Sequence, residues 1–464
     1  MTKLYERTAA ELAALIRTGA VSSREVVEAH LARIDEENGH VNAITVVLRE
    51  SALADADAAD SRAPTRPLHG VPFTIKENID CLDSATTHGV PALEHAMPYV
   101  DAPVVSRLRA AGAIPIGRTN LSEMGLRVST DNPLRGRTLN PWNPELTPAG
   151  SSGGDAAALA TGMTPLGIGT DMGGSLRNPA YCCGVATLKP TTGRIPHASS
   201  LPPLDHGMAG QAMLVTGPMA RSVGDLRLAL RVLAGRDIRD PRSVNAPLEG
   251  PDPDVSRAAL VTRLPGANIA ADTLAAIDRA GDLLAAAGWT VERAEPPELE
   301  RVSAVWGELL ATDFFDLLPT MRPTLTASVS DHMTRMCYAF DVEDRSNHAL
   351  HAERSHLTRQ WSEFLSTYPV AIGPTLTCPP WPVDADLDPH TGIEMLRRAT
   401  IFIMPGNVLG LPSIALPTGV VDGLPTGIQI YADLWREDRC LAAAEIIEAG
   451  VDAGIPIDSV GRPR

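Results

Sequence analysis

The sequence predicts an α/β protein in which helices cover both faces of a sheet. Amphipathic helix patterns and short apolar strand patterns alternate from about residue 68 to residue 235, and such alternation is typical of the α/β class. Similar patterns return between residues 272 and 449. A chain of 464 residues with 44% hydrophobic residues can bury a large core, although its length alone would suggest two or three domains.

Three helices are predicted at the N-terminal end, over about residues 5–61. Thr8 and Glu11, and again Ser22 and Glu25, have the spacing of a capping box, in which each side chain bonds to the backbone amide of the other residue. An alanine-rich third helix completes the segment. We interpret these helices as scaffold, because they carry no pattern of reactive side chains.

Apolar runs and helix patterns predict the next elements in order. They are a strand over 68–76, a helix over 104–111, a strand over 114–117, a helix beginning at 119–124, a long loop over 132–148, a helix over 155–162 and a strand over 164–169. The alternation of helices and strands continues through residues 222–235. Asp101 is the expected N-cap of the helix over 104–111. Residues 236–253 break the alternation and are expected to form a surface excursion.

The C-terminal half contains a long helical segment. Asp272 is the expected N-cap of a helix over 273–287, and a strand over 289–293 follows. Residues 300–366 are expected to be mostly helical, and their aromatic and methionine side chains fit either core packing or the wall of an apolar substrate pocket. The remaining expected elements are strands over 368–374, 412–417 and 426–430 and a closing helix over 437–449.

The net charge argues against two kinds of partner, and the cysteine pattern indicates the cellular compartment. The net charge of −16 and the pI of about 5.2 argue against nucleic acid or an anionic membrane surface. No apolar run is long enough to cross a membrane, and residues 1–17 lack the apolar core of a secretory signal. The six cysteines are scattered without CxxC spacing, so we expect free thiols in a cytoplasmic protein.

Three histidines, His348, His351 and His356, fall on one expected helix. The first two have i,i+3 spacing, which could bind a metal in principle. No carboxylate or cysteine at a suitable spacing completes a site, and the HExxH motif is absent. We therefore expect a solvated helix face and no metal centre.

Two serines lie inside glycine-rich turns between residues 147 and 177. Ser151 lies in the run GSSGG, and Ser175 ends the run GGS, 24 positions later. The glycines punctuate apolar segments, which argues against a flexible linker. Neither run is followed by the lysine of a phosphate-binding loop, and the run GIG over 167–169 lacks the third glycine of a dinucleotide fingerprint. The residues alone leave open a catalytic serine site or an anion-binding turn.

Three stretches of the chain match the signature of one known family. They read GVPFTIKENI, AGSSGGDAAALA and GTDMGGSLRNPAYCCGVATLKPTTGR, and the similarity extends from about residue 5 to about residue 450. The chain resembles the amidase signature family of serine hydrolases. The resemblance implies one amidase domain over residues 1–464, built on a large central mixed β-sheet with helices on both faces. Its implied parts are N-terminal helices over about 5–61, a signature core over about 68–235 and a helical, pocket-forming excursion over about 300–366.

The resemblance implies a Ser-Ser-Lys triad. Matched to the family pattern, Ser175 is the nucleophile that forms the acyl-enzyme, Ser151 is the bridging serine and Lys76 is the general base. A lysine accepts a proton only when neutral, and burial beside an apolar strand should lower its pKa. Ser151 can accept one proton while it donates another, so it can relay between the other two. In the family the bridging serine follows a cis peptide bond.

The turn before the second serine is the expected oxyanion hole. Its successive backbone amides, which form a nest-like set of donors, belong to Met172, Gly173, Gly174 and Ser175. Three further side chains are expected to orient this loop, namely Ser152, Asp171 and Arg177. The expected site holds no metal and no cofactor.

The chain departs from the family pattern at two positions. The family usually has glycine where Ala149 stands, and a left-handed backbone there would strain alanine by about 1–2 kcal/mol. We expect instead a backbone conformation that alanine accommodates. Asp155 stands where small residues are common, and we expect its side chain to cap the start of the following helix.

The resemblance implies a stand-alone amidohydrolase that cleaves carboxylic amides through an acyl-enzyme. Family chemistry extends to aryl amides, esters and carbamates. The apolar residues at 300–340 favour a small, neutral, hydrophobic amide or carbamate as substrate, and the expected enzyme is a monomer or homodimer. The alternative is the amidase subunit of a glutamine-dependent tRNA amidotransferase. A third hypothesis is a nucleotide- or anion-binding module.

Overall fold

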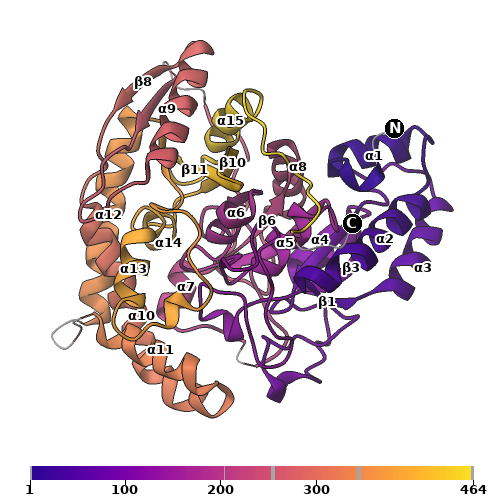
Figure 1. Ribbon diagram of the computed structural model, residues 1–464, viewed down its shortest axis with the longest axis horizontal. Coiled ribbons are helices and arrows are strands. Elements are labelled where there is room, and N and C mark those ends of the chain that lie inside the picture. The colour runs from indigo at the N-terminus through magenta and orange to yellow at the C-terminus, as the bar shows by residue number, and fades with distance from the viewer. Residues whose placement is uncertain (1–2, 203, 252–255, 341, 343–345, 461–464) are drawn as a thin grey trace.

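Eleven strands form one sheet in the computed structural model, which describes residues 3–202, 204–251, 256–340, 342 and 346–460 (Figure 1). In chain order the strands are β1 Ile44–Val47, β2 Pro72–Lys76, β3 Ile114–Thr119, β4 Leu166–Asp171, β5 Ala186–Lys189, β6 Val215–Ala220, β7 Arg257–Leu260, β8 Thr290–Arg293, β9 Val370–Pro374, β10 Ser413–Val421 and β11 Leu424–Tyr431. Their order across the sheet is β1-β3-β2-β4-β6-β5-β10-β11-β9-β7-β8.

Fifteen α-helices surround this sheet within the described residues. They are α1 Ala9–Arg17, α2 Ser23–Val41, α3 Arg49–Asp60, α4 Pro103–Ala110, α5 Gly153–Ala160, α6 Arg177–Cys183, α7 Met208–Met213, α8 Val223–Leu233, α9 Ala271–Ala286, α10 Leu299–Met321, α11 Ala327–Tyr338, α12 Asn347–Thr367, α13 Gly392–Ala399, α14 Met404–Val408 and α15 Glu437–Glu448. None of these described helices combines the length and the apolar character needed to cross a membrane.

The sheet is mixed, as expected. Strand β2 pairs in parallel with both β3 and β4, and β7 pairs in parallel with both β8 and β9. The strands between these two parallel groups pair antiparallel. Because β2 and β4 run in the same direction, their C-terminal ends, Lys76 and Asp171, lie at the same edge of the sheet.

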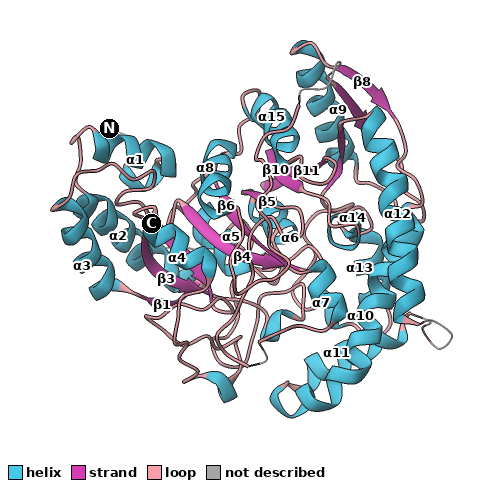
Figure 2. Ribbon diagram, turned by 180° about the vertical axis from the view of Figure 1, so that it is seen from behind, coloured by secondary structure: helices cyan, strands magenta, loops and turns pink. Residues whose placement is uncertain are grey.

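Helices cover both faces of the sheet (Figure 2). In β9, Val370 and Ile372 pack into one core cluster and Ala371 packs into another, because successive side chains of a strand point to opposite faces. The first cluster includes residues of α1, α4, α8, α9 and α15. The opposite face is covered by α10, α12 and α14 near β9 and by α2, α3, α5 and α6 near β1, β3 and β6. The predicted α/β class with two covered faces is confirmed.

The expected helix starts are confirmed at the N-terminal end and wrong at two later helices. Both capping boxes, Thr8 with Glu11 and Ser22 with Glu25, are present. The N-caps of α4 and α9, however, are Ala102 and Ala270 and make no side-chain cap. The carboxylate of Asp101 instead accepts a hydrogen bond from the backbone amide of Leu82, which is far away in sequence and therefore invisible to a local pattern.

The helix expected to begin at residues 119–124 is absent from the described chain. Thr119 still belongs to β3, and a single 3₁₀ turn follows over Glu123–Gly125. Met124 has φ of +52°, in the left-handed region, so a right-handed helix cannot continue through it.

The long helical segment is confirmed, since α10, α11 and α12 fill most of residues 300–366. Residues 341 and 343–345 of that segment lie outside the described residues. The expected surface excursion over 236–253 contains turns and an isolated bridge but no helix or strand as far as residue 251, and residues 252–253 lie outside the described chain.

Candidate active site

The two serine turns meet at the edge of the sheet where β2 and β4 end. Ser151 follows a cis peptide bond after Gly150, as expected, and α5 begins two residues later. Ser175 lies in the short connection between β4 and α6. The backbone amide of Ser152 donates to the carbonyl oxygen of Ser175 at 3.1 Å, so the two turns are in direct contact.

Lys76 is the last residue of β2, and its ammonium nitrogen contacts the first serine turn. The Nζ atom donates to Ser151 Oγ at 2.6 Å, to Ser152 Oγ at 2.9 Å and to Thr170 Oγ1 at 3.1 Å. The side chain is fully buried, with an exposed fraction of 0%. The structure therefore brings the expected base and the expected bridging serine together.

Burial changes the protonation of Lys76. Removal from water lowers its pKa to about 7, against the opposing attraction of the Asp155 and Asp171 carboxylates. An unperturbed lysine has a pKa near 10.4 and is almost entirely charged at neutral pH. In this site a substantial fraction of Lys76 is neutral near pH 7, and only the neutral amine can accept a proton.

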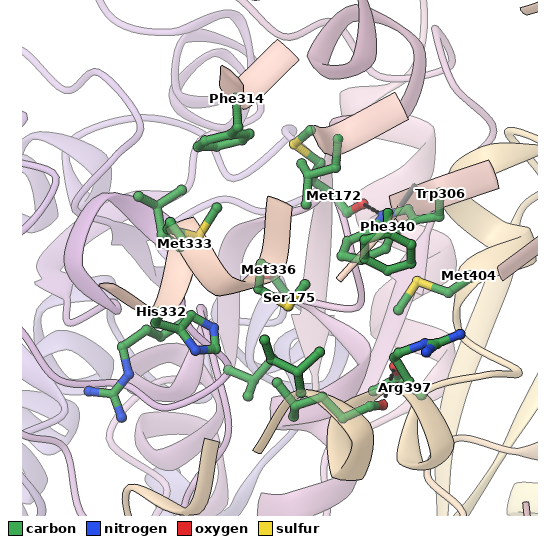
Figure 3. A pocket seen from close by; sticks show the side chains of 18 of the residues that line it. Met172, Ser175, Trp306, Phe314, His332, Met333, Met336, Phe340, Arg397 and Met404 are labelled. Carbon is green, nitrogen blue, oxygen red and sulfur yellow. Dashed lines mark hydrogen bonds between the residues drawn. The ribbon is translucent and has the colours of Figure 1, made fainter. Parts of the chain in front are cut away.

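Ser175 faces a cavity. Ser175 lines a cavity of about 120 Å³, and its side chain lies near the centre of the labelled lining residues in Figure 3. Within the described residues, no hydrogen bond joins the hydroxyl of Ser175 to that of Ser151. Two members of the expected triad are thus directly linked, and the third is held beside them through its backbone.

The turn before Ser175 is held by two side chains. Asp171 Oδ1 accepts from the backbone amide of Gly174 at 2.8 Å, and the indole Nε1 of Trp306 donates to the carbonyl oxygen of Met172 at 2.9 Å (Figure 3). The amide of Gly174 is therefore already occupied. The amides of Gly173 and Ser175 donate no hydrogen bond to any described residue, which leaves them free to bind an oxyanion.

Asp171 and Arg177 form a buried ion pair that holds this turn. Arg177 donates to the Asp171 carboxylate through Nε at 3.0 Å and through a terminal nitrogen at 3.1 Å, and both side chains have an exposed fraction of 0%. Burial opposes ionisation of the carboxyl, but the charge and hydrogen bonds of Arg177 lower the pKa of Asp171 well below its ordinary value. The backbone amide of Leu176 also donates to the carboxylate. Asp171 and Arg177 therefore fix the conformation of the turn that carries Ser175.

The expectations for Ala149 and Asp155 are wrong. Ala149 has φ of +59°, in the left-handed region, and it is held there by hydrogen bonds with Thr130 and Thr147. The N-cap of α5 is Ser152, and Asp155 lies in the first turn of the helix. Neither carboxylate oxygen of Asp155 has a hydrogen-bond partner among the described residues, so it caps nothing.

Apolar side chains from α10, α11 and the residues directly after α11 form one wall of the cavity beside Ser175 (Figure 3). The wall includes Trp306, Phe314, Met333, Met336 and Phe340. Several of these side chains also pack together in one buried cluster, so both interpretations of the segment hold. The polar lining side chains include His332, whose pKa burial lowers, and Arg397, whose guanidinium lies over the ring of Phe340.

Sequence reasoning missed Thr170 and His332 at this site, and it treated Trp306 only as one of the aromatic side chains of residues 300–366. Thr170 accepts a hydrogen bond from Lys76, Trp306 anchors the turn through Met172, and His332 lines the cavity. Thr170 directly precedes Asp171, so a search for hydroxyl groups beside the signature could have found it. Trp306 and His332 come from α10 and α11, more than 120 residues from either serine, and no local pattern marks them.

The described histidines on α12 contribute nothing to the site. His348, His351 and His356 lie on one helix, as expected, and the first and last of them are exposed. No group of three or more His, Cys, Asp or Glu side chains within the described residues is arranged to hold a metal ion.

Proteins similar to this chain include amide hydrolases and amidotransferase components. The Amidase family profile matches residues 25–441. The chain is 39% identical over 460 residues to the indoleacetamide hydrolase of Bradyrhizobium diazoefficiens, which covers 97% of this chain and 87% of the relative. It is 33% identical over 477 residues to a glutamyl-tRNA(Gln) amidotransferase subunit of Thermus thermophilus, covering 94% and 96%. The solved structure of a bacterial aryl acylamidase of the amidase signature family matches with a TM-score of 0.82 at 26% identity, covering 100% of both chains.

Proposed function

This chain belongs to the amidase signature family and hydrolyses amide C–N bonds, and we propose that it does so through an acyl-enzyme on Ser175, with Ser151 as proton relay and Lys76 as general base. The observation that carries the proposal is the 2.6 Å contact between the buried Nζ of Lys76 and Ser151 Oγ. Serine attacks a carbonyl only as its proton leaves, so Ser175 needs a path for that proton to the amine of Lys76. The hydroxyl of Ser151 would supply that path.

The proposed acylation moves one proton along this chain. Ser175 Oγ bonds to the carbonyl carbon, its proton passes to Ser151, and the proton of Ser151 passes to the lone pair of Lys76. The resulting ammonium then returns the proton through Ser151 to the leaving nitrogen, and the C–N bond breaks. Water repeats the sequence in place of Ser175 and releases the acid. The first step requires the Ser175 hydroxyl to turn from the cavity toward Ser151.

The negative oxygen of the tetrahedral intermediate would bind the backbone amides of Gly173 and Ser175. Both amides lack a partner within the described chain, whereas Gly174 already donates to Asp171. Removal of one such donor in comparable enzymes costs about 3–4 kcal/mol of barrier. The ion pair of Asp171 with Arg177 and the hydrogen bond of Trp306 support this arrangement, because they prevent the turn from rotating its amides away.

A small, neutral arylacetamide is the proposed substrate, with indole-3-acetamide as the first probe. The cavity is lined by aromatic and methionine side chains next to Ser175. None of the described lining residues is Asp or Glu, so nothing on the wall favours a cationic substrate. The relative at 39% identity is named an indoleacetamide hydrolase. Carbamates and aryl esters present the same carbonyl to Ser175 and belong to the candidate range.

The second candidate function is the amidase subunit of a glutamine-dependent amidotransferase, which the 33% identity to the Thermus thermophilus protein favours. The higher identity to a hydrolase and the apolar cavity wall favour the stand-alone enzyme.

We also propose a cytoplasmic location, which the six unpaired thiols support.

A substrate panel on the purified chain tests these proposals. We expect turnover of indole-3-acetamide and of aryl amides by the chain alone, and little turnover of glutamine or aliphatic amides. Hydrolysis of glutamine without hydrolysis of aryl amides would favour the amidotransferase function. Absence of hydrolysis of every amide, carbamate and ester in the panel, by a chain that is also not labelled by a fluorophosphonate, would overturn the serine mechanism.

A further inference from the structure

Asp155 is a buried acid to which the proposed mechanism assigns no role. Its side chain has an exposed fraction of 0%, and neither carboxylate oxygen has a hydrogen-bond partner among the described residues. A carboxylate that leaves water without hydrogen bonds is strongly destabilising. The chain therefore carries an unfavourable group within its signature stretch, at a position that does not cap α5.

The carboxyl of Asp155 lies between α5 and the sheet, over the strands that lead to Lys76. A methyl group placed on Gly167 of β4 would lie 3.0 Å from Asp155 Oδ1 and 3.4 Å from Thr74 Oγ1. Thr74 is paired with Gly167 across the sheet, and Lys76 stands two residues after Thr74 on the same face of β2. The missing side chain of Gly167 thus leaves room for the carboxyl beside Thr74, on the face of β2 that also carries Lys76.

Other charged groups near Lys76 have hydrogen-bond partners of their own. Asp171, at the end of β4, is held by two hydrogen bonds from Arg177. Arg118 on β3 donates to Ser84 Oγ and to the carbonyl oxygen of Ile79.

His88, in the loop after β2, is a base whose pKa burial lowers to about 4, so it is neutral at pH 7. Asp155 is consequently an acid near Lys76 that forms no ion pair with another cation in the described chain, although the charge of Arg118 also favours its ionised form. The hydroxyl of Thr119 on β3 lies beside Asp155 and has no other hydrogen-bond partner among the described residues.

We infer that Asp155 is a positioning residue that acts through Lys76, as the buried counter-charge of the ammonium formed when Lys76 takes the proton of Ser151. The inference rests on the proposed function. Asp155 neither accepts nor donates the proton in this scheme: the O–H bond of Ser151 breaks, the N–H bond of Lys76 forms, and the ionised form of Asp155 supplies the negative charge. Without it, the new positive charge would stand in a dry site with no anion of its own.

The pKa shifts of Asp155 and Lys76 agree with this geometry. Burial raises the pKa of Asp155 to about 7, and the Thr119 hydroxyl and the Lys76 charge oppose that rise. Burial lowers the pKa of Lys76, and Asp155 is the foremost group that opposes that fall. Each group therefore keeps the other closer to its charged form, as expected of two ionisable groups that share one buried site.

The test measures how fast a fluorophosphonate labels the wild-type chain and its variants as a function of pH. This readout follows the reactivity of Ser175 and does not depend on knowing the amide. In Asp155→Asn the carboxylate charge is lost, so the pKa of Lys76 falls. The acid limb of the profile should move to lower pH by about one unit or more. The plateau rate should fall about tenfold, because a weaker base accepts the proton less readily.

Asp225→Asn is the matched control. Asp225 is also a buried acid in the first turn of a helix, α8, but its oxygens accept from the backbone amides of Ala9 and Ala10. This variant should lose thermal stability and keep the wild-type acid limb. Asp155→Ser, which restores a small residue at the position, should shift the acid limb as Asp155→Asn does.

An acid limb that stays in place in folded Asp155 variants would overturn the inference. Absence of labelling in the wild-type chain would instead remove the proposed function on which the inference rests. The two failures are thus distinguishable.

Discussion

The backbone amide of Ser152 donates a hydrogen bond to the carbonyl oxygen of Ser175 at 3.1 Å, although the two residues are 23 positions apart in the chain. This single bond joins the turn after the long loop to the turn after β4. It places the hydroxyl that faces the cavity next to the hydroxyl that Lys76 contacts. The bond uses only backbone atoms, so side-chain substitutions at either serine should leave the two turns together.

Replacement of the nucleophile tests the assignment of Ser175. Ser175→Ala should retain the fold and lower kcat for amide hydrolysis by at least about 10³-fold, because the acyl-enzyme cannot form. Mass spectrometry should detect no fluorophosphonate adduct. Ser303, which lines the same cavity, gives the control: Ser303→Ala should keep both the adduct and most of the activity. An adduct on Ser175→Ala would place the nucleophile elsewhere.

The pH dependence of the wild-type rate tests Lys76. Burial lowers the pKa of Lys76 to about 7, and the charged form present below that pKa cannot accept a proton. Activity should therefore be present above about pH 7 and should decline as pH falls through that value. Lys76→Met should cost at least about 10²-fold in kcat. A Lys76→Met chain with near-normal rates at neutral pH would exclude the lysine base.

The strained backbone at Ala149 predicts a stabilising substitution. Its φ of +59° disfavours any side chain, whereas glycine adopts this region freely. After subtraction of the extra freedom of glycine in the unfolded chain, Ala149→Gly should raise the free energy of unfolding by about 0.5–1 kcal/mol. Denaturant unfolding measures it. The control Ala157→Gly, in the helical interior of α5, should destabilise instead. Equal destabilisation by both would contradict the strain argument.

The indole of Trp306 predicts an effect on the rate rather than on substrate choice. Its Nε1 holds the carbonyl of Met172, and Trp306→Phe removes that bond while it keeps an aromatic ring in the wall. Loss of one hydrogen bond of about 1 kcal/mol should lower kcat roughly fivefold for every substrate. Phe314→Leu changes the wall without touching the turn, so it should alter KM in a substrate-dependent way. If Trp306→Phe changes only KM, the bond does not support catalysis.

Local chemistry made much of the fold predictable. The capping boxes at Thr8 and Ser22 and the helices over 300–366 follow from residues close together in sequence, and the structure confirms them. The wrong predictions share one cause. Asp101 and Asp272 look like caps by position, but the backbone around α4 and α9 places the N-cap at another residue. The left-handed conformation of Ala149 is held in part by Thr130, which lies 19 positions away and is not part of the local pattern.

The order of residue types along the chain indicates which groups can perform the chemistry, because a glycine-bracketed serine or a lysine after an apolar strand is recognisable within a few positions. Whether Lys76 is removed from water and whether the Asp155 carboxyl finds a hydrogen-bond partner depend on segments that lie far apart in the chain. Those properties arise when β2 and β4 pair and α5 closes over them, since burial and charge pairing depend on distance in space and not on distance in sequence.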